Sequence, residues 1–238
     1  MTPSAVLFDC DGVVVDSEGA AFSLLGQELG AAGLVLDRAG MEHLFLGGTV
    51  AGIYVKARGL GADLPDTWVG GFYQRLYAKL RLGVDLVPGI TQVLARLQAA
   101  GVPFAIGSNG SDEKMAITLG QHPAVRTAFG RHVYSGQTLG RPKPAPDLYL
   151  HAAMQLGADP ARAVVIEDSA NGARAARAAG MRCYGYAPRD FGRGEIGRGE
   201  IGKAGLGQAG LGQAALALQA EGAVLFHDMA DLPGLLGI

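Results

Sequence analysis

Residues 5–17 read AVLFDCDGVVVDS, and this stretch decides the fold. Its first four residues are apolar, which predicts a short buried strand. The strand leads to Asp9 and Asp11, whose side chains point to one side because residues two apart share a face of an extended chain. Gly12 then allows the backbone to turn. The stretch therefore predicts two carboxylates that converge at the open end of a buried strand.

Two carboxylates this close repel one another unless a cation or a proton lies between them. Mg²⁺ prefers carboxylate and water oxygens, so Asp9 and Asp11 predict a magnesium site. A carboxylate can also act as a covalent nucleophile, as in the aspartyl-phosphate of ATPases. The alternative for this pair is a local structural role, in an Asx-turn and a helix N-cap, which are common positions for aspartate.

Three later segments also place polar groups where a strand gives way to a loop. Residues 105–110, AIGSNG, are an apolar strand that ends in a hydroxyl, an amide and a glycine. Residues 140–147, GRPKPAPD, are a proline-stiffened loop that presents one lysine. Residues 163–169, AVVIEDS, are a strand that ends in two acids. Open α/β sheets bind their ligands at such strand ends, so these groups are candidates for one site.

Taken in order, the four segments resemble the four motifs of the haloacid dehalogenase superfamily of phosphohydrolases. The resemblance covers the chain except for a segment near residues 189–213. It implies an α/β fold, with a Rossmann-like doubly wound parallel-sheet core and an inserted all-helical cap. It also implies a Mg²⁺-dependent phosphatase that acts on a small phosphorylated metabolite, such as a sugar, polyol or sugar-acid phosphate, through an aspartyl-phosphate.

The resemblance assigns catalytic roles to four residues. Asp9 attacks phosphorus, and Asp11 protonates the leaving alkoxide and then deprotonates the attacking water. Lys143 pairs with Asp9 and the phosphoryl oxygens, and Ser108 donates its hydroxyl to the phosphoryl group. The second acid favours phosphatase chemistry over dehalogenation, because a halide leaves without a proton. For Lys143 the alternative is a solvated surface lysine.

The resemblance also implies a metal site and a substrate site. The metal ligands are Asp9, Asp11 through its backbone carbonyl, Asp168 and, directly or through water, Glu167. Asp168 could instead cap the helix that follows it. The residues expected to contact substrate are Glu18, at the pocket mouth, and Asn109 and Gly110, whose backbone amides would form an anion nest.

Within the superfamily, the sequence is most similar to the branch that contains β-phosphoglucomutase, phosphoglycolate phosphatase and 6-phosphogluconate phosphatase-like enzymes. A phosphomutase of the β-phosphoglucomutase type is therefore the main alternative. Such mutases have a histidine soon after the second acid pair and a Lys-Asn pair after the motif serine. Here Ala21 and Ser111-Asp112 stand in those places, which favours hydrolysis. An inactive regulatory module would lack a motif residue, and none is missing.

The pattern of apolar residues predicts two domains. After the first strand, over residues 4–9, about 65 residues read as helices, far more than a simple βαβ connection needs. We therefore expect a core of residues 1–15 and 84–238 and a helical cap of residues 16–83. The predicted cap helices are 20–32, 41–45, 50–58 and 67–81. Within the core the predicted helices are 90–100, 112–119, 146–156 and 170–179, and the strands are 102–107, 132–134, 163–166 and 182–186.

Residues 190–213 contain two five-residue units, GRGEI and AGLGQ, each of which occurs twice in succession. Segments this rich in glycine bury too little apolar surface to offset the entropy lost on ordering. We expect a Gly-rich repeat insertion within the core, with a ligand loop as the alternative. A helix over 216–221, a strand over 223–226 and a helix over 229–236 are expected to complete the core.

Composition excludes several other classes of protein. The chain has 238 residues, of which 49% are hydrophobic, and a formal net charge of −2, as in an ordinary globular protein. No basic excess suggests nucleic acid, and neither a signal peptide nor a run of 18 apolar residues suggests a membrane. Cys10 and Cys183 are expected to be buried thiols of a cytoplasmic protein. We expect a monomer or a weak homo-oligomer.

Overall fold

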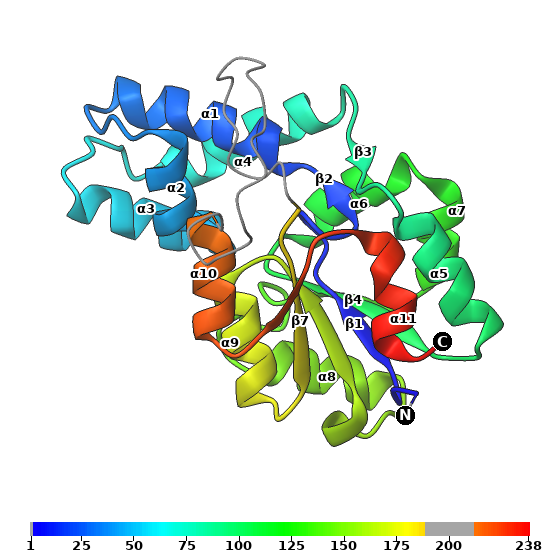
Figure 1. Cartoon of the computed structure of the whole chain (residues 1–238). Coiled ribbons are helices and arrows are strands. Elements are labelled where there is room, and N and C mark those ends of the chain that lie inside the picture. The colour runs from blue at the N-terminus through cyan, green and yellow to red at the C-terminus, as the bar shows by residue number, and fades with distance from the viewer. Residues whose placement is uncertain (1, 189–211) are drawn as a thin grey trace, which may run out of the picture.

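The computed structural model describes residues 2–188 and 212–238 (Figure 1). The repeat insertion predicted over residues 190–213 therefore lies outside the described residues, apart from Gly212 and Gln213. Among the described residues, no helix combines the length and the apolar character that a membrane span requires. Cys10 and Cys183 are buried free thiols, as predicted.

The core is a six-stranded sheet in which every pair of neighbouring strands is parallel. Its order is β5-β4-β1-β6-β7-β8, so the chain winds outward in both directions from β1. This confirms the doubly wound sheet, whose point of reversal is where such folds bind ligands. The strands are β1 (Val6–Phe8), β4 (Phe104–Ser108), β5 (Val133–Ser135), β6 (Val164–Glu167), β7 (Arg182–Tyr186) and β8 (Val224–Phe226).

Helices cover both faces of the sheet, which explains why its strands are mostly apolar on both faces. Val6 and Phe8 of β1 face one hydrophobic cluster, and Leu7 between them faces the other. The first cluster includes side chains of α5 (Ile90–Ala99), α6 (Asp112–Gly120), α7 (Pro123–Phe129) and α11 (Leu232–Leu236). The second includes side chains of α8 (Asp147–Gln155), α9 (Ala170–Ala178) and α10 (Gln213–Ala220).

Four helices lie between the first strand and the rest of the core, gathered at the end of the molecule away from the two termini (Figure 1). They are α1 (Glu18–Ala31), α2 (Arg38–Phe45), α3 (Val50–Gly59) and α4 (Trp68–Leu80). The chain enters and leaves this group through β2 (Val15–Asp16) and β3 (Asp85–Leu86), which pair as an antiparallel ribbon. We propose that residues 16–83 form a separate cap that ends at this ribbon.

Besides a 3₁₀ turn, Pro160–Arg162, three elements were not predicted, and each is short. The two-residue strands of the ribbon are too short to show an alternating pattern. Helix α7 begins at Pro123, in its first turn, and ends before Gly130, whose φ is +54°. The predicted helix over residues 229–236 is in fact a 3₁₀ turn, Met229–Asp231, followed by α11. Pro233 stands in the first turn of α11, where a missing N–H breaks no helical hydrogen bond.

Candidate active site

A pocket lies between the cap helices and the carboxyl ends of β1, β4 and β6. The core side of the pocket is polar and includes seven of the eight residues singled out above as catalytic, substrate-binding or metal-binding groups of the core. The cap side is mainly apolar. The core residues are Asp9, Asp11, Ser108, Asn109, Gly110, Lys143 and Asp168, and Glu18 of α1 joins them from the cap.

Asp9 and Lys143 form a buried ion pair. Asp9 directly follows β1, and its backbone N–H donates to the carbonyl of Ile166, 2.9 Å away, on the neighbouring strand. The Lys143 Nζ lies 2.7 Å from Asp9 Oδ1, and the two side chains are only 2% and 9% exposed. The alternative of a solvated surface lysine is therefore wrong. Lys143 is placed to contact whatever group binds to Asp9.

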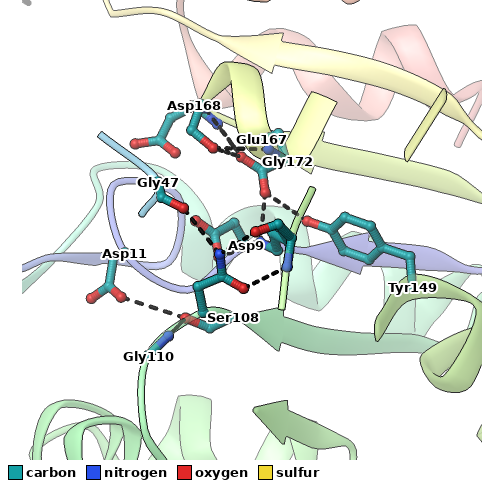
Figure 2. A network of polar contacts seen from close by, with 12 residues as sticks. Asp9, Asp11, Gly47, Ser108, Gly110, Tyr149, Glu167, Asp168 and Gly172 are labelled. Atoms are coloured by element: carbon teal, nitrogen blue, oxygen red, sulfur yellow. Dashed lines mark hydrogen bonds and ion pairs between the residues drawn. The ribbon is translucent and has the colours of Figure 1, made fainter. Parts of the chain in front are cut away.

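The side chain of Asn109 holds the Lys143 loop in place. Its Oδ1 accepts from the Lys143 N–H at 2.8 Å, and its Nδ2 donates to the Lys143 carbonyl at 3.0 Å. The same Nδ2 donates to the Gly47 carbonyl, also at 3.0 Å, in the loop between α2 and α3 (Figure 2). Asn109 was predicted as a substrate contact through its backbone; its side chain joins strand β4, the lysine loop and the cap.

Glu167, at the end of β6, accepts hydrogen bonds on both carboxylate oxygens (Figure 2). Its Oε1 lies 2.6 Å from Lys143 Nζ and 2.7 Å from the Tyr149 hydroxyl. Its Oε2 accepts from the N–H groups of Asp168 and Ser169, both at 3.1 Å, and from the Ser169 hydroxyl at 2.8 Å. Both oxygens are thus engaged by protein donors, and Glu167 is placed to orient Lys143.

A glycine makes room for Glu167. A Cβ on Gly172, in the first turn of α9, would lie 1.7 Å from Glu167 Oε1. The Ser169 hydroxyl accepts from the Gly172 N–H at 3.1 Å and so forms the N-cap of α9. The alternative in which Asp168 caps this helix is therefore wrong, because Ser169 has that role.

Asp168 and Glu18 face one another beside Gly12. A Cβ on Gly12 would lie 2.1 Å from Asp168 Oδ2 and 3.4 Å from Glu18 Cδ. Both carboxyl groups are buried, and among the described residues Asp168 Oδ2 and Glu18 Oε2 have no hydrogen-bond partner. Burial, and then the neighbouring Asp11 carboxylate, raise the pKa of Glu18 to about 8. Burial, and then Glu18, raise the pKa of Asp168 well above its usual value.

These acids fit a divalent cation. Asp9, Glu167 and Asp168 each offer a carboxylate oxygen, and the three oxygens lie within 4.8 Å of one another. Burial raises the pKa of Asp9 to about 7, against the opposing effect of Lys143. Crowded, desolvated carboxylates with an oxygen that lacks a partner are the setting in which a bound cation lowers the energy of the charged form. Asp168 has the free oxygen, whereas both oxygens of Glu167 are already engaged.

The Asp11 carboxylate is held between three donors. Its Oδ1 accepts from the Ser17 hydroxyl and from Lys114 Nζ, 2.7 Å away. Its Oδ2 lies 3.5 Å from the Ser108 hydroxyl (Figure 2). Burial acts to raise the pKa of Asp11, but the charge of Lys114 and the hydrogen bonds from Lys114 and Ser17 hold it below its usual value. The short Oδ1 contacts fix Asp11 on the side of the pocket next to α6.

The Ser108 hydroxyl lies at the buried end of β4 and accepts from the Gly110 N–H at 2.9 Å. In this structure the Gly110 amide, predicted to contact substrate, therefore points at Ser108. Lys114 and Tyr149 are two polar groups of this region that sequence reasoning missed, and Tyr73 and Gln137, which also line the pocket, are two more. A lysine in the first turn of a helix, where the helix dipole disfavours a positive charge, is a signal that could have drawn attention to Lys114.

Comparisons with known proteins agree with this geometry. The family model described as haloacid dehalogenase-like hydrolase matches residues 3–180. A phosphoglycolate phosphatase of Chromobacterium violaceum is 33% identical over 197 residues, which cover 77% of this chain and 86% of the relative. A crystal structure of a HAD family hydrolase from Deinococcus radiodurans, with bound phosphate and sodium, has a TM-score of 0.71 and 34% identity, and covers 99% of this chain and 96% of that one.

A third relative is much longer than this chain. The bifunctional riboflavin kinase/FMN phosphatase of Arabidopsis thaliana is 31% identical over 182 residues, which cover 75% of this chain but 47% of the relative. The prediction of an enzyme of the phosphatase class is confirmed by the family and by relatives that carry this name. The motifs, the doubly wound sheet and these matches together show that the chain belongs to the haloacid dehalogenase-like hydrolase family.

Proposed function

We propose that the protein is a Mg²⁺-dependent phosphomonoester hydrolase that acts on a small phosphorylated metabolite, such as a sugar, polyol or sugar-acid phosphate, through an aspartyl-phosphate on Asp9. The observation that carries this proposal is the pair of Asp9 and Lys143, 2.7 Å apart at the end of β1 inside the pocket. The phosphoglycolate phosphatase relative and the related structure with bound phosphate support it.

Asp9 is the proposed nucleophile. Its carboxylate attacks phosphorus and forms the aspartyl-phosphate, while the leaving alkoxide departs. Lys143 offsets the charge on the phosphoryl oxygens. Its ion pair with Glu167 and the hydrogen bonds between its backbone and the Asn109 side chain hold it in place. The Ser108 hydroxyl, whose only acceptor in the described residues is Asp11 Oδ2 at 3.5 Å, donates to the same phosphoryl group. All of these groups are buried, so their charges act with little screening by water.

Asp11 is the proposed acid and base. Its carboxyl group gives a proton to the ester oxygen in the first step and takes one from the attacking water in the second. The apolar side chains of the cap wall, Phe22, Phe45 and Phe72, exclude other water from the pocket.

Asp9, Asp168 and the backbone carbonyl of Asp11 are the proposed ligands of Mg²⁺. When bound, the ion offsets the repulsion between the Asp9 carboxylate and the phosphate dianion. We propose that Glu167 acts on this site indirectly, because Lys143, Tyr149 and the start of α9 already occupy its oxygens.

Ala21 lines the pocket at the place where the mutases of the related branch have a histidine. An alanine side chain cannot act as an acid or a base there, which favours transfer of the phosphoryl group to water over a mutase reaction.

Release of inorganic phosphate from a panel of sugar, polyol and sugar-acid phosphates, with Mg²⁺ and with a chelator, tests the proposal. We expect Mg²⁺-dependent release by the wild-type protein and none by Asp9→Asn. Asp66→Asn, on the cap surface with a side chain that is 93% exposed, is the matched control and keeps full activity. Phosphate release by Asp9→Asn at the wild-type rate would contradict the aspartyl-phosphate route.

A further inference from the structure

The position of Lys114 is electrostatically unfavourable, so its presence there calls for a reason other than the stability of α6. It lies in the first turn of α6, behind the N-cap Ser111, whose hydroxyl accepts from the Lys114 N–H at 3.1 Å. A positive charge is unfavourable at this end of a helix. Its side chain is also only 13% exposed. A buried ion pair is by itself weak evidence of a role in stability, because desolvation offsets most of the attraction.

The Lys114 ammonium reaches the active-site pocket. Among the described residues that line the pocket, Lys114 and Lys143 are the only lysines or arginines. Lys143 is shared between Asp9 and Glu167, on the side where the phosphoryl group is transferred. Lys114 lies on the other side of Asp11, the residue that faces the ester oxygen in the proposed reaction. The pocket thus has a second cation, next to the residue proposed to protonate the leaving group.

The current partner of Lys114 is a residue that the proposed reaction needs. Its Nζ lies 2.7 Å from Asp11 Oδ1, and the described residues offer it no second ion-pair partner. An ammonium has three N–H donors, so it can accept a second anion. Lys114 and Ser17 hold Oδ1, whereas Oδ2 lies in the pocket, 3.5 Å from the Ser108 hydroxyl, so the ion pair with Lys114 restrains how the Asp11 carboxyl group can turn.

We propose that Lys114 recognises a second anionic group, a carboxylate or a further phosphate, on the leaving part of the substrate. Binding of this group draws the ammonium from Asp11 and leaves the Asp11 carboxyl group free to turn to the ester oxygen. This inference rests on the proposed phosphatase function and narrows its substrate to small phosphate esters with two anionic groups, such as a phosphorylated hydroxy acid or a bisphosphate.

Two matched pairs of substrates test the proposal. The first is 2-phosphoglycolate and 2-hydroxyethyl phosphate, which differ in a carboxylate against a neutral hydroxymethyl group. The second is propane-1,3-diol bisphosphate and its monophosphate, which tests a further phosphate as the second anion. The measured quantity is the ratio of kcat/KM within each pair, for the wild type, Lys114→Met and Lys114→Arg.

We expect the wild type to prefer the member with two anionic groups in at least one pair. Lys114→Met should lower kcat/KM for that member by about 10- to 100-fold, as expected for a lost charge-assisted hydrogen bond, and change the neutral member far less. Lys114→Arg should keep the preference, which also shows that the position tolerates substitution.

Two results would overturn the inference. The first is a wild type with equal kcat/KM for both members of each pair. The second is an equal loss of kcat/KM for both members in Lys114→Met, which would mean that Lys114 only positions Asp11. Neither result affects the proposed function, since the neutral esters would still be hydrolysed. A wild type that hydrolyses none of the four esters, nor an aryl phosphate, would instead remove the proposed function itself and this inference with it.

Discussion

At the scale of single residues, Glu167 shows how the site is kept in order. Its carboxylate accepts from Lys143 and Tyr149 on one oxygen and from the start of α9 on the other. Lys143 Nζ also lies over the Tyr149 ring, 4.9 Å from its centroid. Tyr149 is fully buried in the second hydrophobic cluster, so the active-site lysine is supported from inside the core.

Tyr149→Phe should therefore lower activity and stability without abolishing either. The ring under Lys143 remains, and only the hydrogen bond to the Glu167 carboxylate is lost. Such a bond to a charged group is worth about 1.5–3 kcal/mol, so we expect a loss of that order in the free energy of unfolding, measured by urea denaturation. We also expect a lower kcat with little change in KM. Tyr134→Phe is the control for kcat. The Tyr134 hydroxyl lies 2.9 Å from His132 Nδ1, and neither residue lines the pocket.

The two acids after β1 should respond differently to the leaving group. Asp9→Asn removes the nucleophile, so turnover should vanish with every substrate. Asp11→Asn removes the acid and base, typically worth about 10²–10⁴-fold, and the loss should be severe with a sugar phosphate. The aryl oxide of an aryl phosphate departs without protonation, so pre-steady-state kinetics with substrate in excess should show a burst of aryl alcohol followed by a slow steady state. Loss of the burst in Asp11→Asn would contradict its separate acid–base role.

Residue-scale features differ in how far they can be predicted from sequence. Asp9, Ser108 and Asp168 stand in short motifs at the ends of β1, β4 and β6, whose carboxyl ends meet at one edge of the sheet, and Lys143 stands in a proline-rich motif in the loop before α8. The structure places all four in one pocket. Lys114 and Tyr149 lie within ordinary amphipathic helices, α6 and α8, and their contacts with Asp11 and Glu167 depend on how those helices pack. The polar partners of motif residues therefore had to come from the structure.

At the scale of elements, the loop between α2 and α3 meets the core at Gly47. Its φ is +70°, and its carbonyl accepts from Asn109 Nδ2. A Cβ on Gly47 would lie 2.5 Å from the Ser169 hydroxyl, which is closer than real Cβ atoms come. The loop can lie against β4 and α9 because this residue has no side chain.

Gly47→Ala should keep this loop from closing on the core. Both its positive φ and the contact with Ser169 disfavour alanine, so we expect a clear loss of kcat/KM for phosphate esters. Gly61→Ala is a matched control, since Gly61 is also in the cap and has a φ of +99°, but nothing lies within 4 Å of its Cβ position. Equal losses of kcat/KM in the two variants would show that backbone strain causes the effect, and not the clash between the added methyl group and the Ser169 hydroxyl.

Most helices and core strands could be predicted to within a few residues, because a parallel sheet covered on both faces needs mostly apolar strands and helices with one apolar face in alternation. The exceptions share a physical cause. The β2–β3 ribbon has two residues in each strand, and its pairing joins Val15 to Leu86, about 70 residues apart in the chain. Such a pairing leaves no local pattern, yet it determines where the cap meets the core.

At the scale of the whole molecule, the cap meets the core through polar contacts beyond this ribbon. Tyr73 of α4 accepts from Gln137 Nε2 at 2.9 Å, and Gln121 Nε2 donates to the Leu80 carbonyl at 3.0 Å. The pocket lies between the two parts, so substrate must enter and product must leave across this boundary. Polar contacts of this kind exchange readily with water, which makes the boundary a natural place for opening.

We therefore predict that residues 16–83 move as one body about the β2–β3 ribbon. Fluorescent labels on Val35→Cys in the cap and Met154→Cys on α8 report the distance between cap and core, since both positions are well exposed and the native cysteines are buried. Adding Mg²⁺ and vanadate, a mimic of the phosphoryl group, should narrow the distribution of this distance. The pair Val35→Cys and Val55→Cys, with both labels in the cap, should not change. An unchanged distribution for the first pair would show a rigid boundary, and a change in the second would show that the cap does not move as one body.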